Sequence, residues 1–199
     1  VTQNLPLYAF GVFPVDQRWR PCLWLLILAF LSIVTIFKPR WSWLGKVLPI
    51  AWVGVIPLGV GLLSGGLGLL PVESRHWGGF TLTILLMSCS ALLAFPLGIM
   101  FAIGRQSKLP LIKYFSALYI DALRAVPLIS ILFFGQLLIP LFLPLGVEIN
   151  RVSRAVISFT LFVAAYIAED IRGGWQAIPN SQLEAAKALG LSQAQTIRF

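Results

Sequence analysis

The chain has 199 residues, of which 58% are hydrophobic and 11% are charged, and its mean hydropathy is +0.89. A soluble domain of this length buries a core without so apolar a composition, so these values predict a membrane protein. The net charge of +8 is explained by basic cytoplasmic loops, and we expect no nucleic-acid partner.

Residues 1–76 are predicted to form an N-terminal extension with two transmembrane helices. Residues 1–20 are too often interrupted by prolines and charges to cross a membrane. They carry four aromatic residues that suit the membrane–water interface, namely Tyr8, Phe10, Phe13 and Trp19. Two uncharged apolar runs follow, at about 22–37 and 47–70, and the first is at the short end for a crossing of about 30 Å.

Residues 77–199 are predicted to hold three more transmembrane helices, at about 80–103, 114–143 and 155–172. A cytoplasmic loop at 173–199 is expected to follow them. The second of these apolar segments contains Asp121, Arg124 and two prolines, and the third ends in a short run of charged residues.

The distribution of basic residues orients these helices. Loops 38–46 and 105–113 each hold three basic residues and no acidic one, which places them in the cytoplasm. Loops 71–79 and 144–154 carry mixed charges and are assigned to the outside. Residues 173–199 then lie in the cytoplasm.

No residue pattern indicates catalysis or a metal. The chain lacks the G-x-x-x-x-G-K-[ST] phosphate loop, so we expect it not to bind ATP itself. His76 is the single histidine, and Cys22 and Cys89 fall in apolar runs, where small buried thiols are the expected interpretation. We therefore predict no catalytic residue, no metal ligand and no cofactor.

Two pairs of opposite charges lie in or beside apolar segments. Asp121 and Arg124 are three residues apart, as are Glu169 and Arg172, so each pair shares one face of a helix and can neutralise itself. Charges in apolar segments usually face a bundle interior or water. These residues are candidates either for the border of a substrate pathway or for structural ion pairs that fix helix ends near the cytoplasmic surface.

The segment from Pro179 to Ser192 is polar and rich in small residues. Ser181 and Glu184 have the spacing of a capping box, which predicts a helix start, and Gly190 suits the left-handed residue that ends a helix. Ser192 and Gln195 repeat the capping-box spacing and predict a second short helix. The first helix would present alanines, which leave a helix face flat enough for another protein to approach.

Several motifs resemble those of ABC importer permeases. Glu184, Ala185, Ala186, three further residues and Gly190 match the coupling-helix signature, and the preceding run 172–182 resembles the amino-acid subfamily. Run 165–174 looks like that subfamily's Ala-Tyr-x-x-Glu-x-x-Arg-Gly-Gly. Run 121–128 resembles its acidic-x-x-Arg-Gly-x-Pro-Leu, with alanine in place of the usual glycine. Over residues 77–199 the chain is similar to polar amino-acid permeases, and most closely to the general L-amino-acid type.

The resemblance implies an all-α polytopic membrane protein with the transmembrane-domain fold of type I ABC importers. It implies a multi-pass subunit of the bacterial inner membrane that moves amino acids by alternating access. Glu184, Ala185, Ala186 and Gly190 would couple it to separate ATPase subunits, which bind and hydrolyse ATP. A second permease, expected to be a paralogue, and a periplasmic amino-acid-binding protein complete the predicted assembly.

Three alternatives stay open at this point. A permease for another solute, such as phosphate or an oligopeptide, would share the coupling-helix signature. A channel or secondary carrier would predict inverted repeats, which are not evident between the halves. The chain starts at Val1 and stops one residue before the Ile-x-Leu-Pro that normally closes the signature. We therefore expect a fragment of a permease, incomplete at the C-terminus and at the N-terminus, or a truncated non-transporting remnant.

Overall fold

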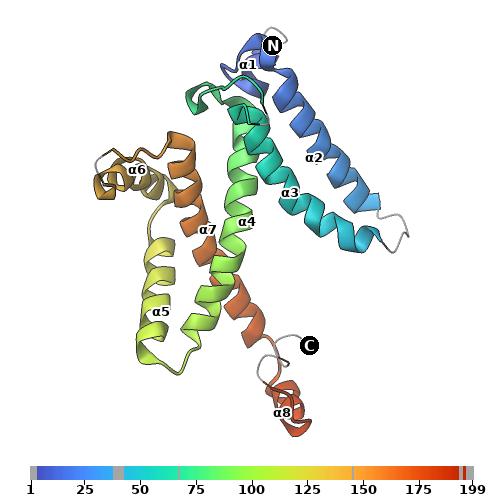
Figure 1. The fold of residues 1–199 in the computed structure, drawn as a ribbon. Helices are drawn as coiled ribbons and strands as arrows, with labels where there is room; N and C mark the ends of the chain where they lie inside the picture. Colours follow the sequence, from blue (N-terminus) through green and yellow to red (C-terminus); the bar gives the residue numbers. More distant parts are fainter. Residues whose placement is uncertain (1–3, 38–42, 67, 145, 193–194, 196–199) are drawn as a thin grey trace. The chain divides into compact units, whose positions relative to one another are not determined.

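A computed structural model describes residues 4–37, 43–66, 68–144, 146–192 and 195, and at Leu183 the backbone alone. All regular secondary structure in these described ranges is helical (Figure 1). The chain divides into two compact units. One comprises Val1–Leu93 with Pro127–Leu161, and the other comprises Ala94–Val126 with Phe162–Phe199.

The first unit begins with two short helices and two long ones. These are α1 (Leu5–Phe10), η2 (Val15–Gln17), α2 (Trp19–Phe37) and α3 (Leu44–Ser64). It also contains η3 (Ser74–His76), the start of α4 (Gly79–Arg105), α6 (Leu128–Leu138), η4 (Ile139–Phe142) and the start of α7 (Arg151–Gln176). The second unit holds the remainders of α4 and α7, together with α5 (Pro110–Ala125) and α8 (Asn180–Ala188).

Within the described ranges, four helices are long and apolar enough to cross a membrane. They are α2 together with η2 (Val15–Phe37), α3, α4 and α7, and a fifth span is possible if α5 and α6 form one bent crossing. A helix suits this role because its backbone hydrogen bonds are all made within the segment, whereas lipid offers none. The predicted all-α polytopic membrane fold is confirmed.

Segment 114–143, predicted as one transmembrane helix with Pro127 and Pro140 as breaks, is not a single helix. The structure has two helices there, α5 and α6, separated by Val126 and Pro127. The cause is local, because Pro127 disfavours helical geometry in the residue before it and Val126 is extended, with φ −105° and ψ 137°. Pro110 occupies the first turn of α5, a position that tolerates its missing N–H, so the helix begins before Tyr114.

The core of the first unit forms around Trp24, which is fully buried. Its indole N–H donates a hydrogen bond to the carbonyl of Val55 on α3 over 2.9 Å. Gly59 makes room for the ring, because a Cβ there would lie 2.3 Å from the indole nitrogen. Phe13 packs into the same core. Phe13 was predicted with three other aromatic residues to suit the membrane–water interface, but it is 2% exposed and packs in the protein core, so its side chain is not presented to lipid.

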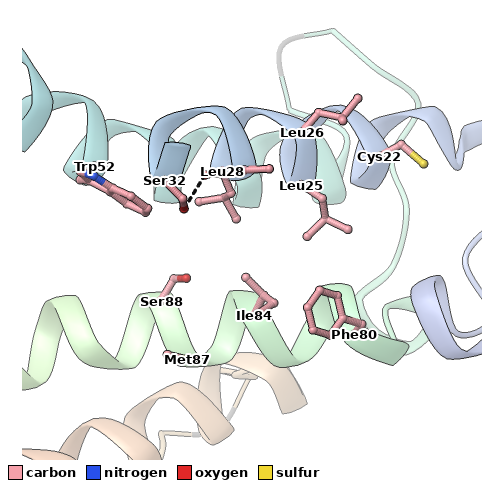
Figure 2. Close-up of a pocket in the computed structure, with 11 residues that line it drawn as sticks. Cys22, Leu25, Leu26, Leu28, Ser32, Trp52, Phe80, Ile84, Met87 and Ser88 are labelled. Carbon is pink, nitrogen blue, oxygen red and sulfur yellow. Dashed lines mark hydrogen bonds between the residues drawn. The ribbon is translucent and has the colours of Figure 1, made fainter. Parts of the chain in front are cut away.

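An apolar groove of about 750 Å³ runs between α2 and α4 of the first unit (Figure 2). Leucines of α2 face Phe80, Ile84 and Met87 of α4 across it, and Trp52 of α3 contributes to its wall. Ser32, which also lines it, donates its hydroxyl to the carbonyl of Leu28. This hydroxyl is satisfied within its own helix, which keeps that wall apolar.

We expect Gly59→Ala to destabilise the first unit by about 1–3 kcal/mol, because the added methyl overlaps the indole of Trp24 and displaces its hydrogen bond. The midpoint of thermal unfolding of the full chain in detergent measures this effect. Gly54→Ala on the same helix is the matched control, since nothing lies within 4 Å of its Cβ position. Equal unfolding midpoints for the two variants would contradict the role given to Gly59.

Candidate functional site

Helices α4, α5 and α7 approach one another closely in the second unit. Gly98 faces Ile167 of α7 and Gly104 faces Ser116 of α5, and a Cβ at either glycine would lie 2.6 Å or less from the facing side chain. Phe101 of α4 stacks on Tyr119 of α5 with ring centroids 3.8 Å apart. These small residues and stacked rings bring charged side chains at the ends of three helices within reach of one another.

Five charged residues form a cluster there, which we call the charge cluster. It contains Arg105 of α4, Asp121 and Arg124 of α5, and Glu169 and Arg172 of α7. The Glu169 carboxylate lies 3.3 Å from a guanidinium nitrogen of Arg105 and 3.5 Å from one of Arg124. It also accepts a 2.9 Å hydrogen bond from Nε of Arg172.

Glu169 is the centre of this cluster. Its side chain is 17% exposed, whereas those of its three arginine partners are 25% to 37% exposed. Asp121 supplies the other negative charge, 3.1 Å from Arg105, and its side chain is 58% exposed. Three guanidinium groups against two carboxylates leave one net positive charge. Charged groups at this depth are tolerated because each has an opposite charge beside it.

The two ion pairs predicted from the sequence have different outcomes in the structure. Glu169 and Arg172 form an ion pair along α7. Among the described residues, Asp121 and Arg124 form no ion pair with each other; Asp121 turns to Arg105, and Arg124 turns to Glu169. Partners on other helices are within reach because glycines of α4 let it pack closely against both α5 and α7.

Sequence reasoning missed Arg105 as a member of the site. It was placed in a basic loop at 105–113, but the structure makes it the last residue of α4, and Lys113 lies within α5. The signal was a single basic residue at the end of a long apolar run. Tyr166, in the predicted run 165–174, lies beside the cluster: its ring centroid is 5.6 Å from the guanidinium carbon of Arg124.

Helix α8 carries the second set of predicted residues. It starts at Asn180 with Pro179 before it, and no side chain caps its first turn. The predicted capping box of Ser181 and Glu184 is therefore wrong, because the helix begins at Asn180, two residues too early for Ser181 to be its cap. Glu184 and Ala185 are exposed, and Ala186 is half-buried.

The end of α8 is a Schellman motif. Gly190 has a φ of +74°, its N–H donates to the carbonyl of Lys187 over 2.9 Å, and the N–H of Leu191 donates to the carbonyl of Ala186 over 3.1 Å. The left-handed conformation predicted for Gly190 is confirmed. The backbone thus stops the helix and turns the chain sharply.

The chain around α8 differs in two other respects from the prediction. Helix α7 continues through Gly173 and Gly174 to Gln176, so the connection to α8 is shorter than expected. After α8, Ser192 and Gln195 form reciprocal capping-box bonds, 2.8 Å and 3.4 Å long. The rest of the second predicted helix lies outside the described residues.

The helices, the charge cluster and α8 define a polytopic α-helical membrane protein with a short polar helix after its last described apolar helix. The family model of the binding-protein-dependent transport system inner membrane component matches residues 94–199. The chain therefore belongs to this family.

Curated relatives support the assignment over a longer range. The chain is 41% identical over 197 residues to the inner membrane amino-acid ABC transporter permease protein YhdY of Escherichia coli. The aligned region covers 95% of this chain and 52% of YhdY. It is 46% identical over 133 residues to the glutamate/glutamine/aspartate/asparagine transport system permease protein BztC of Rhodobacter capsulatus, covering 67% of this chain and 31% of that protein. The chain thus spans about half the length of the first relative and about a third of the second.

A solved structure shares the fold. The crystal structure of an amino acid ABC transporter with histidines superposes with a TM-score of 0.52 at 29% identity, over 58% of this chain and 53% of that one. The predicted resemblance to permeases of amino-acid ABC importers is confirmed, as is the type I importer fold.

We expect Glu169→Gln to lower the free energy of unfolding by about 1–3 kcal/mol, because three arginines lose their shared carboxylate. Their partial exposure keeps the loss below that of a fully buried charge. Asp170→Asn, the adjacent exposed carboxylate on the same helix, is the control and should have little effect. Thermal unfolding of the full chain in detergent measures both variants, and equal unfolding midpoints would contradict the role given to Glu169.

Proposed function

We propose that this chain supplies the membrane-crossing permease part of an ATP-driven importer for amino acids. Membership of the inner membrane component family supports the transport role, and the amino-acid permeases among the relatives support the substrate class. The single observation that carries the mechanism is α8, a short polar helix with the Glu-Ala-Ala signature and a sharply defined end.

Helix α8 has the properties of a docking element for an ATPase. Glu184 and Ala185 are exposed, and alanine side chains let a partner's surface approach the helix backbone. The Schellman motif at Gly190 fixes where the helix ends, so a force applied to α8 by a partner would move it as a rigid helix. We propose that Glu184, Ala185, Ala186 and Gly190 make the coupling contact and that a separate ATPase subunit binds and hydrolyses ATP.

The charge cluster is proposed to make α4, α5 and α7 move together. Arg172 lies four residues before the last residue of α7, and α8 follows after a short connection. Ion pairs that join three helices next to the coupling element would turn its displacement into a rigid-body movement of helix ends. We favour this structural role for Asp121, Arg124, Glu169 and Arg172 over a substrate-binding role, because each has a protein partner in the cluster.

The proposed assembly has two permeases, two ATPases and a periplasmic amino-acid-binding protein in a bacterial inner membrane. We infer that residues 77–199 form the permease core and that residues 1–76 form an N-terminal extension. The basic residues in loops 38–46 and 105–113 favour a cytoplasmic location for these two loops, and residues 173–199 would then lie on the same side. Alternating access would follow from closure of the ATPase dimer against the coupling helices.

We expect Gly190→Val to reduce the amino acid transported per ATP hydrolysed by roughly tenfold, within the usual range of coupling free energies. A β-branched residue is strained at a φ of +74°, so the helix end and the coupling surface shift. Proteoliposomes containing the full-length permease with its ATPase and binding protein measure both rates, using labelled glutamate, glutamine, aspartate and asparagine.

Gly190→Asn is the matched control, because asparagine tolerates the left-handed conformation, and it should retain most of the coupling. Unchanged coupling in Gly190→Val would refute the role of α8. Uptake of phosphate or an oligopeptide, with none of the four amino acids, would refute the substrate class.

A further inference from the structure

The chain before α2 forms a small structure with an unusually apolar surface. We call residues 4–19 the N-terminal cap; it contains α1, η2 and the first residue of α2. Six of its large side chains are between 49% and 74% exposed, namely Leu5, Leu7, Tyr8, Val12, Val15 and Trp19. Its charges are limited to Asp16 and Arg18. Exposed apolar patches of this kind mark sites that contact a membrane or another protein.

The N-terminal cap is held in place by specific contacts and is not a loose end. Phe13 is buried in the core of the first unit. The hydroxyl of Thr81 on α4 donates to the carbonyl of Ala9 over 2.9 Å. Gly11 and Gly78 meet backbone to backbone, since a Cβ on Gly11 would lie 2.6 Å from the Cα of Gly78. The exposed side chains are therefore presented from a fixed backbone.

These contacts place the N-terminal cap at the ends of three apolar helices. It leads directly into α2 and touches the start of α4 (Figure 1). Arg20, in the first turn of α2, donates to the carbonyl of Leu70 over 2.8 Å, which brings the segment after α3 to the same end. Since α2, α3 and α4 are each suited to cross the bilayer, the place where their ends meet lies at the membrane–water boundary.

We propose that the N-terminal cap is an interfacial membrane anchor whose exposed side chains insert at the boundary between lipid headgroups and acyl chains. Tyr8 and Trp19 have the amphipathic rings that favour this depth. Arg18 donates its Nε to the carbonyl of Phe13. The groove between α2 and α4 begins at Cys22 and Phe80, just inside the two helix starts, so apolar surface continues from this end along both helices (Figure 2).

The anchor fixes the start of α4 at the membrane surface. The Thr81 hydroxyl of α4 bonds the carbonyl of Ala9, and Gly78, just before α4, meets Gly11 backbone to backbone; both contacts restrict relative movement. The inference goes beyond the proposed transport function, because it requires only that α2, α3 and α4 cross a bilayer.

Site-directed spin labelling of the full-length protein in phosphatidylethanolamine–phosphatidylglycerol vesicles tests the anchor. In a cysteine-free background, Leu7→Cys and Val12→Cys are labelled one at a time with a nitroxide. Glu73→Cys, an exposed charged position in the segment before α4, is the control. Collision with oxygen reports acyl surroundings, and collision with a water-soluble nickel chelate reports water.

We expect both cap positions to collide more with oxygen than with the chelate, and to meet the chelate several-fold less than position 73 does. Chelate collisions as frequent as at position 73 would place the cap in water and overturn the proposal. An immobilised spectrum with few collisions of either kind would show that a protein partner covers the cap, which also overturns it. Val15→Cys provides a third site, and each labelled protein is first checked for an unchanged size-exclusion profile.

Discussion

The packing of α4, α5 and α7 in the second unit depends on the carboxylate of Glu169, which three arginines share. Arginines from three helices converge on it, and each of them gains a negative charge beside it. The arrangement is possible because glycines at 98 and 104 let the helices approach closely. Packing and electrostatics thus support each other: the small residues place the charges, and the charges hold the helices together.

The first unit is organised by a different principle. Its core depends on one indole that donates to a backbone carbonyl of the neighbouring helix and fills the space left by Gly59. The family model begins at residue 94, yet similarity to the Escherichia coli permease extends over 95% of the chain. The N-terminal part thus carries its own core and is bonded to the start of α4 through Ala9 and Thr81.

Much of this fold could be read from the sequence, because long apolar runs predict helices and a glycine after a short polar helix predicts its left-handed end. The boundary between α5 and α6 was harder, since Pro127 inside an apolar run marks a break but does not say whether the helix kinks or ends there. The charge cluster was harder still. Spacing within one helix predicts the pair Glu169–Arg172, whereas the partners of Asp121 and Arg124 are set by which helices face each other.

Both ends of α8 are defined by backbone geometry: Pro179 precedes its first residue, and Gly190 closes its last turn. The exposed side chains between these ends, such as Gln182, Glu184 and Lys187, take no part in setting them and can therefore be replaced without loss of either helix end. In the function proposed above, one shape of coupling helix could thus carry different surfaces and select different ATPases.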